Sequence, residues 1–171
     1  MLFRSNFNGT GSFDVEASQD GSSVAAQSGS VTSTITVTPV GDTPTVNDIT
    51  TDEDTQSGAI TMAINANDGA EVTHFRISNI TNGSLFQNDG STAIADGEYI
   101  TVAQGTSGVK FTPDANFNGD GTFDVEASED GSTVAAQSSA ATSTITVTPV
   151  GDTPTVNDIT TDEDKIGRAH V

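Results

Sequence analysis

The sequence predicts an all-β protein made of short antiparallel strands, and three observations support this. Segments such as "TITVTPV" (34–40 and 144–150) and "FDVEA" (13–17 and 123–127) alternate apolar and polar residues, which places one face of each strand in a core and the other in water. Asn-Gly, Asp-Gly and Ser-Gly pairs stand between the candidate strands and tolerate the positive φ angles of tight reversals. No stretch longer than one turn shows helical periodicity.

A long internal repeat sets the domain organisation. Residues 6–54 align without a gap on residues 116–164, and 42 of the 49 positions are identical. The offset of 110 residues exceeds the roughly 20–50 residues of solenoid repeats, so the repeated unit has the size of a domain. The seven differing pairs are Thr10/Asp120, Ser12/Thr122, Gln19/Glu129, Ser23/Thr133, Gly29/Ser139, Ser30/Ala140 and Val31/Ala141.

The repeat predicts one complete unit flanked by parts of two others. Residues 6–44 are expected to supply the last two strands of a preceding repeat and a linker, 45–154 one complete repeat, and 155–164 the start of the next. The alternation places strands of the complete unit, in chain order, at 45–50, 59–65, 72–80, 109–112, 122–128 and 141–148.

Residues 85–86 and 99–102 are further strand candidates whose place in the order does not follow from the pattern. Six to eight short strands in about 110 residues fit an antiparallel β-sandwich. The apolar face of the strands predicts a core that includes Phe111, Phe117, Phe123, Val125, Ile145 and Val147.

Both ends of the chain differ from the repeat. When residues 2–5 and 165–171 are translated back into DNA, they resemble the two adapters of short-read sequencing, and residues 1–5 and 165–171 belong to no repeat. We therefore expect both ends to be artefacts and exclude them from the fold. The alternative is that they are genuine, divergent termini.

The composition is strongly acidic. The chain has 24 Asp and Glu residues against 5 Lys and Arg, a net charge of −19, and no cysteine. Such a surface repels nucleic acid and anionic membranes, so neither nucleic-acid binding nor membrane insertion by this segment is expected. Bound divalent cations would offset the repulsion between acids, and plain solubility or salt adaptation is the alternative explanation. The absence of cysteine excludes disulfides and thiolate metal sites.

Two stretches of the sequence resemble a known family, and the likeness extends over essentially all of residues 6–164. "DGEYITVAQGTSGVKFTPDANFNGDGTFDVEASEDG" (96–131) and "STITVTPVGDTPTV" (143–156) are similar to the cadherin-like, Ig-like tandem repeats of large secreted or surface-attached bacterial adhesins, including repeats-in-toxin adhesins. The resemblance implies an extracellular rod of Ca²⁺-stiffened β-sandwich domains. The linker "GDTPTVND" departs from the more usual "NDAP", so Gly151 replaces one expected Asn ligand.

Candidate Ca²⁺ ligands follow from the expected sandwich, whose turns and linkers bring acids to its two ends. Ca²⁺ takes six to eight oxygen ligands from carboxylates, amides, carbonyls and water. At the exit end the candidates are Asp52, Glu53, Asp54, Asp120, Asp152, Asn157 and Asp158. At the entrance end they are Asp42, Asn47, Asp48, Asp68 and Asp130, with Asn67, Glu71 and Glu129 beside them. The alternative is that these are ordinary turn residues.

The functional expectation is a structural spacer. No nucleophile motif, phosphate loop or thiol is present, so enzymatic activity is not expected. The spacer would contact neighbouring repeats and project distal adhesive domains, which would bind host or surface glycans or proteins. The alternative is a recognition module that binds glycan or protein through its own end loops, although Tyr99 is the only tyrosine and tryptophan is absent.

Overall fold

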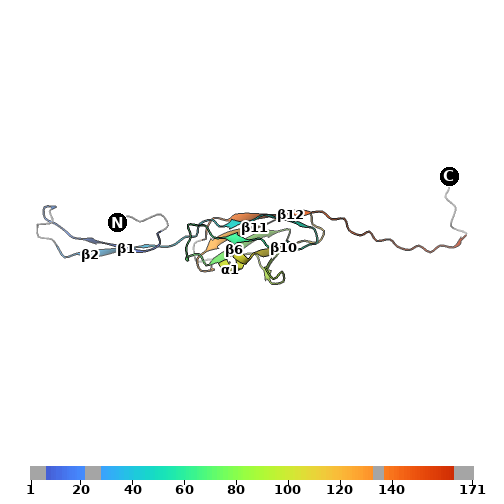
Figure 1. The fold of residues 1–171 in the computed structure, drawn as a ribbon. Coiled ribbons are helices and arrows are strands. Elements are labelled where there is room, and N and C mark those ends of the chain that lie inside the picture. The colour runs from blue at the N-terminus through green and yellow to red at the C-terminus, as the bar shows by residue number, and fades with distance from the viewer. Residues whose placement is uncertain (1–6, 22–27, 133–136, 164–171) are drawn as a thin grey trace.

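The computed structural model describes residues 7–21, 28–132 and 137–163, and their fold is mostly β (Figure 1). The ends predicted to be artefacts, residues 1–5 and 165–171, lie outside this part of the chain. The elements in order are β1 (Gly9–Val15), β2 (Val31–Val37), β3 (Thr45–Val46), β4 (Ile49–Asp52), β5 (Met62–Ala63), β6 (His74–Thr81), β7 (Gly83–Gln87), β8 (Ala93–Ile94), β9 (Tyr99–Thr101), α1 (Val102–Ser107), β10 (Val109–Pro113), β11 (Gly119–Ser128) and β12 (Ala141–Thr148).

We call residues 45–148 the central body, and the residues of this range that the structure describes form three sheets. The largest has five strands in the order β4-β12-β11-β6-β9, the second has three in the order β10-β7-β8, and β3 pairs with β5. All pairings are antiparallel except that of β12 with β4, which is parallel. Side chains from the five-stranded and three-stranded sheets share one hydrophobic core.

The predicted core residues are confirmed. Alternate residues of β11 and β12 are buried, as the period-two pattern requires. Phe111, Phe123, Val125, Ile145 and Val147 belong to the core, and Phe117 is partly buried against it. The Phe111 ring is held closely, because a Cβ added at Gly83 or Gly121 would lie 2.3 or 2.5 Å from its Cζ atom.

Three details of the strand prediction were wrong. The segment 45–50 forms two short strands, β3 and β4, and the segment 59–65 forms only β5 and an isolated bridge between Ile60 and Val109. The helix α1 follows β9, where no helix is predicted. It begins with a capping box in which Thr101 Oγ1 accepts from Gln104 N at 3.2 Å and Thr101 N donates to Gln104 Oε1 at 2.8 Å. Six residues are too few for a 3.6-residue period to repeat in the sequence.

Two segments leave the central body at its opposite ends (Figure 1). One is the β1–β2 hairpin, joined through residues 38–44. The other is an extended segment, residues 151–163, which we call the tail and in which every residue is exposed. The linker contains the candidate ligand Asp42, and the tail contains Asp152, Asn157 and Asp158.

Candidate metal sites at the ends of the central body

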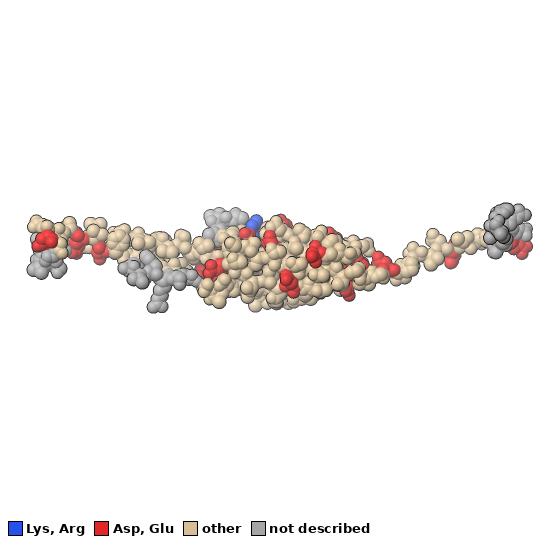
Figure 2. All heavy atoms as spheres, turned by 90° about the horizontal axis from the view of Figure 1, so that it is seen from above, with Lys and Arg blue, Asp and Glu red and all other residues tan. Residues whose placement is uncertain are grey.

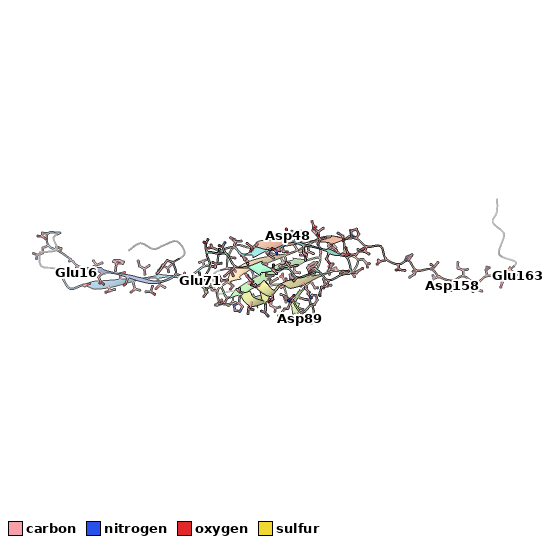
Figure 3. The ribbon with its side chains drawn as sticks, in the orientation of Figure 1. Glu16, Asp48, Glu71, Asp89, Asp158 and Glu163 are labelled. Carbon is pink, nitrogen blue, oxygen red and sulfur yellow. The ribbon has the colours of Figure 1, made fainter. Side chains whose placement is uncertain are left out.

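Four carboxylates gather where the linker from the hairpin meets the central body. We call Asp42, Asp68, Glu71 and Glu129 the entrance cluster. The Asp42 backbone N–H donates to Asp68 Oδ1 at 2.9 Å, which fixes the linker to the loop before β6. Asp42, Asp68 and Glu71 line a hollow of about 180 Å³ together with Asn67, residues 7–8 before β1 and residues 38–40 of the linker. Figure 3 shows Glu71 at the end of the body that faces the hairpin.

In the entrance cluster, burial and neighbouring negative charges raise the pKa values of two carboxylates, Asp68 and Glu129. Burial raises the pKa of Asp68, and the nearby charges of Asp42 and Glu71 raise it further. Burial also raises the pKa of Glu129, with the charges of Asp130 and Glu71 as additional causes. Asp68 Oδ2 and Glu129 Oε1 are buried and accept no hydrogen bond from the described residues. Two acceptor atoms in an acidic setting therefore lack a donor.

The other residues predicted at the entrance end serve local structure. Asp130 accepts from the backbone N–H of Ser132 at 2.9 Å and from its hydroxyl at 3.0 Å, which is the bonding of an Asx turn. Asp48 Oδ1 accepts from Thr144 N at 2.8 Å. The Asn47 side chain donates to Thr61 Oγ1 at 3.0 Å. Asp48 and Asn47 thus tie strands together and do not join the entrance cluster.

At the exit end the predicted acids are also engaged in hydrogen bonds. Asp52 Oδ1 accepts from the Thr148 hydroxyl at 2.5 Å, and Glu53 Oε1 accepts from Val150 N at 2.6 Å. Asp54 has a positive φ of 58° and accepts from Asn116 N at 3.0 Å, while Asp120 accepts from the Thr146 hydroxyl at 3.4 Å. Asp152 and Asn157 lie on the exposed tail, as does Asp158, which is labelled in Figure 3. The arrangement does not bring the exit candidates to one point.

Neither end presents a finished metal site. Within residues 7–21, 28–132 and 137–163, no three Asp, Glu or His side chains are placed to hold one ion. The entrance cluster comes nearest to the needs of a hard cation, because it combines several carboxylates with two buried oxygens that lack donors. An ion at this end would have to draw the side chains closer together.

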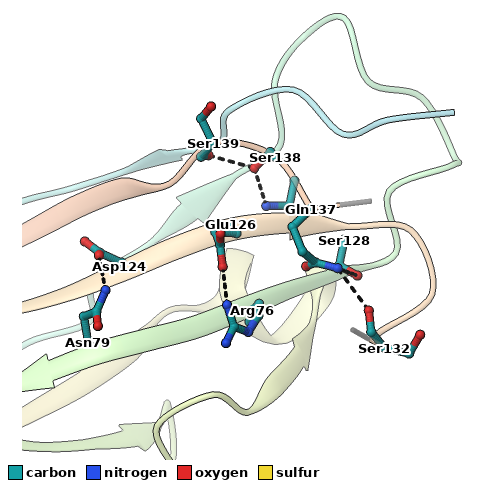
Figure 4. A network of polar contacts seen from close by, with 10 residues as sticks. Arg76, Asn79, Asp124, Glu126, Ser128, Ser132, Gln137, Ser138 and Ser139 are labelled. Carbon is teal, nitrogen blue, oxygen red and sulfur yellow. Dashed lines mark hydrogen bonds and ion pairs between the residues drawn. The ribbon is translucent and has the colours of Figure 1, made fainter. Parts of the chain in front are cut away.

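Other acidic residues have partners that the sequence pattern did not reveal. Asp124 accepts from Asn79 Nδ2 at 2.7 Å, and Glu126 forms an ion pair with Arg76 at 2.7 Å (Figure 4). Asp89 accepts from the hydroxyl and backbone N–H of Thr92 and from Ser91 N, and these bonds lower its pKa to about 2. The Asp-Gly-Ser-Thr order at 89–92 is a recognisable Asx-turn signal, whereas the partners across strands depend on the fold.

No protein-family model matches the sequence, and no curated protein matches it. In the part of the chain that the structure describes, no helix is long and apolar enough to cross a membrane.

Proposed function

We propose that the chain is a Ca²⁺-stiffened structural spacer of a large, secreted or surface-attached bacterial adhesin. In this proposal residues 45–154 form one Ig-like β-sandwich of a tandem array, and the spacer projects adhesive domains elsewhere in the protein. The one core shared by the five-stranded and three-stranded sheets supports the sandwich. The exit of the hairpin and the tail from opposite ends supports an extended array (Figure 1).

The observation that carries the proposal is the pair of donor-less carboxylate oxygens, Asp68 Oδ2 and Glu129 Oε1, in the entrance cluster. Carboxylates with raised pKa values cost free energy at neutral pH unless a cation compensates them. The chain itself supplies few cationic side chains, because it has 5 Lys and Arg residues against 24 Asp and Glu, a net charge of −19. Lys and Arg are also sparse on the face shown in Figure 2.

Ca²⁺ fits the oxygen donors at this place better than a softer metal does. Asp42, Asp68, Glu71 and Glu129 would hold it. Asp42 belongs to the linker from the hairpin, whereas the other three belong to loops of the central body. A cation shared between these residues would therefore fix the direction in which the hairpin leaves the body. A rod of repeats is stiff only if the direction between neighbouring units is fixed, and the bound cation would fix it.

The test uses the full chain and a variant with both raised-pKa carboxylates neutralised, Asp68→Asn with Glu129→Gln. We expect millimolar Ca²⁺, the range of weak extracellular sites, to raise the melting temperature of the wild type and to leave the variant unchanged. In chelator the variant should melt above the wild type, because it lacks the repulsion. Mg²⁺ should replace Ca²⁺ poorly, since it demands a smaller octahedral site.

The matched control is Asp158→Asn, which removes one charge from the exposed tail and should respond to Ca²⁺ as the wild type does. X-ray scattering in Ca²⁺ and in chelator gives a second measurement, because a fixed linker should increase the radius of gyration. Equal melting temperatures and equal radii in the two conditions would contradict the proposal.

A further inference from the structure

The linker between the hairpin and the central body has two parts with different surroundings. Gly41 and Pro44 are buried, whereas Val40, just before them, is 58% exposed. We propose that the end of the body that faces the hairpin is a docking surface for the Gly-Asp-Thr-Pro peptide of residues 41–44. Docking needs no metal ion, and it leaves the joint to bend at residues 38–40.

Gly41 makes the closest contact between the docked peptide and the body. A Cβ atom added there would lie 3.1 Å from Ala127 Cβ and 3.3 Å from Val72 Cγ2. Carbon atoms in contact lie about 3.5–4.0 Å apart, so the surface has no room for a side chain at this position. Both neighbours are buried, so neither can move into solvent to make room. Gly41 does not have a positive φ angle, so glycine is required by the close approach and not by the backbone conformation.

Two side chains of the body bond to the backbone of the docked peptide. The Asp42 backbone N–H donates to Asp68 Oδ1 at 2.9 Å. Asn65 Nδ2 donates to Thr43 O at 3.3 Å. Asp68 N donates to Asn65 O at 3.0 Å, so both side chains come from one turn of the body. These bonds recognise the path of the backbone, while the tight space beside the glycine selects the sequence.

The docking contacts are separate from the proposed Ca²⁺ site. They consist of packing around Gly41 and of hydrogen bonds, so they form without a cation. The only side-chain atom of the entrance cluster that they use is Asp68 Oδ1, whereas the oxygen that lacks a donor is Oδ2. A cation on Oδ2 would leave the bond from Asp42 N in place. Docking therefore does not depend on the proposed Ca²⁺ site.

Residues 38–40 have looser surroundings than the docked peptide. Thr38 and Val40 are exposed. Residues 38–40 line the hollow of about 180 Å³, together with residues 7–8 and acids of the entrance cluster. Segments with few buried contacts move most easily, so bending is concentrated beside this hollow. A cation held in the hollow would restrain the bend, whereas docking fixes residues 41–44 with or without it.

The same peptide recurs in the chain with different surroundings. Residues 150–154 repeat residues 40–44 without a difference. A Cβ atom added at Gly151 would meet nothing within 4 Å, in contrast to one added at Gly41. The two glycines therefore form a matched pair, in which one substitution can be made in the same local sequence with and without the docking surface.

Amide hydrogen exchange in chelator measures docking directly. The Asp42 amide should be protected in the wild type, and Gly41→Val should lower its protection at least about tenfold, because the added side chain cannot fit against the body. The matched control Gly151→Val should leave the protection of Asp42 unchanged. The amides of β12 should stay protected in both variants, which shows that the body remains folded.

Distances between two spin labels locate the bend. Thr36→Cys on the hairpin and Thr106→Cys on α1 are exposed attachment sites, and the natural chain has no cysteine. In chelator the distribution of distances should broaden in Gly41→Val and stay unchanged in Gly151→Val. Pro39→Gly should also broaden it, because it frees the backbone at the bend, but should leave the Asp42 amide protected.

Three results would overturn the proposal. The first is an Asp42 amide that exchanges freely in wild-type protein in chelator but is protected in Ca²⁺, since the cation would then hold the linker. The second is a Gly41→Val chain with the exchange and distances of the wild type. If that variant unfolds β12, Gly41→Ala replaces it, because its Cβ still lies 3.1 Å from Ala127 Cβ. The third is equal Asp42 protection in Gly41→Ala and the wild type.

Discussion

The hairpins β1–β2 and β11–β12 have nearly the same sequence but different surroundings. Their registers are the same, from Gly9 opposite Val37 in one and from Gly119 opposite Val147 in the other. Phe13 is 47% exposed, whereas its equivalent Phe123 is fully buried. The comparison teaches that this sequence determines strand pairing locally, while burial is supplied by the strands that cover the hairpin.

Hydrogen bonds inside the hairpins support the same conclusion. The Ser28 hydroxyl accepts from Ala17 N at 2.8 Å, and the Ser138 hydroxyl accepts from Ala127 N at 2.8 Å. The hydroxyl-to-carboxylate bond between Thr32 and Asp14 recurs between Thr142 and Asp124, at 2.5 Å in each case. These bonds join residues of the same hairpin, so they form with or without a core.

The differences between the copies fall outside the core. Ser23/Thr133 lies outside the described residues. At the six other differing positions, the residue in the second copy is exposed or half-buried. The residues Phe13, Val15, Ile35 and Val37 of the first hairpin therefore match those that β11 and β12 bury. The first hairpin has the apolar face of a core strand pair without the core.

The largest expected difference between the hairpins concerns the aromatic residue. Phe123→Ala should lower the free energy of unfolding by about 3–5 kcal/mol, because it leaves a cavity among buried side chains. Phe13→Ala should change it by no more than about 0.5 kcal/mol, as exposed positions do. Urea unfolding followed by circular dichroism measures both. Comparable losses in the two variants would mean that β1–β2 folds cooperatively with a core of its own.

A smaller difference is expected at the serines that occupy equivalent positions in the two hairpins, Ser143 and Ser33. Ser143→Ala removes the donor to Asn47 O in a buried setting and should cost about 1–3 kcal/mol. Ser33→Ala, its exposed counterpart, should stay within about 0.5 kcal/mol of the wild type. The measurement is the urea midpoint at constant slope. A loss in Ser33→Ala as large as that in Ser143→Ala would show that a second strand, besides β1, pairs with β2 and accepts from Ser33.

The smallest expected effect is at the pair Gln19/Glu129. Because the pKa of Glu129 is raised by folding, its contribution to stability is present at acidic pH and is lost as pH rises through that pKa. In chelator, Glu129→Gln should therefore raise the melting temperature at pH 7 and flatten its dependence on pH between about 4 and 7. The reciprocal change Gln19→Glu should have little effect. If Glu129→Gln lowers stability at pH 7, the carboxylate has a partner in the folded state.

The sequence predicted the strands that bury one face. It predicted only in part where the side-chain oxygens of the candidate ligands lie. Strand β12 has the predicted bounds, and Ile145 and Val147 alternate with threonines as the pattern predicts, whereas buried Ser143 is a polar exception. At the entrance end the backbone N–H of Asp42 donates to Asp68, whereas Asp48 bonds to β12. A carboxylate in a turn can accept from any of several nearby N–H groups. Which of these bonds forms depends on tertiary contacts that no local pattern encodes.

The parallel pair β4–β12 also determines how the molecule responds to force. The chain enters the central body through β3 and β4 and leaves it through β12, at the opposite end (Figure 1). Pulling on the two ends therefore draws β4 and β12 in opposite directions along their common axis. Their ladder and the Asp48–Thr144 and Glu53–Val150 bonds are strained together in shear, not broken one after another. Forced unfolding is governed by the unfolding barrier, so this short pair sets the mechanical strength of the central body.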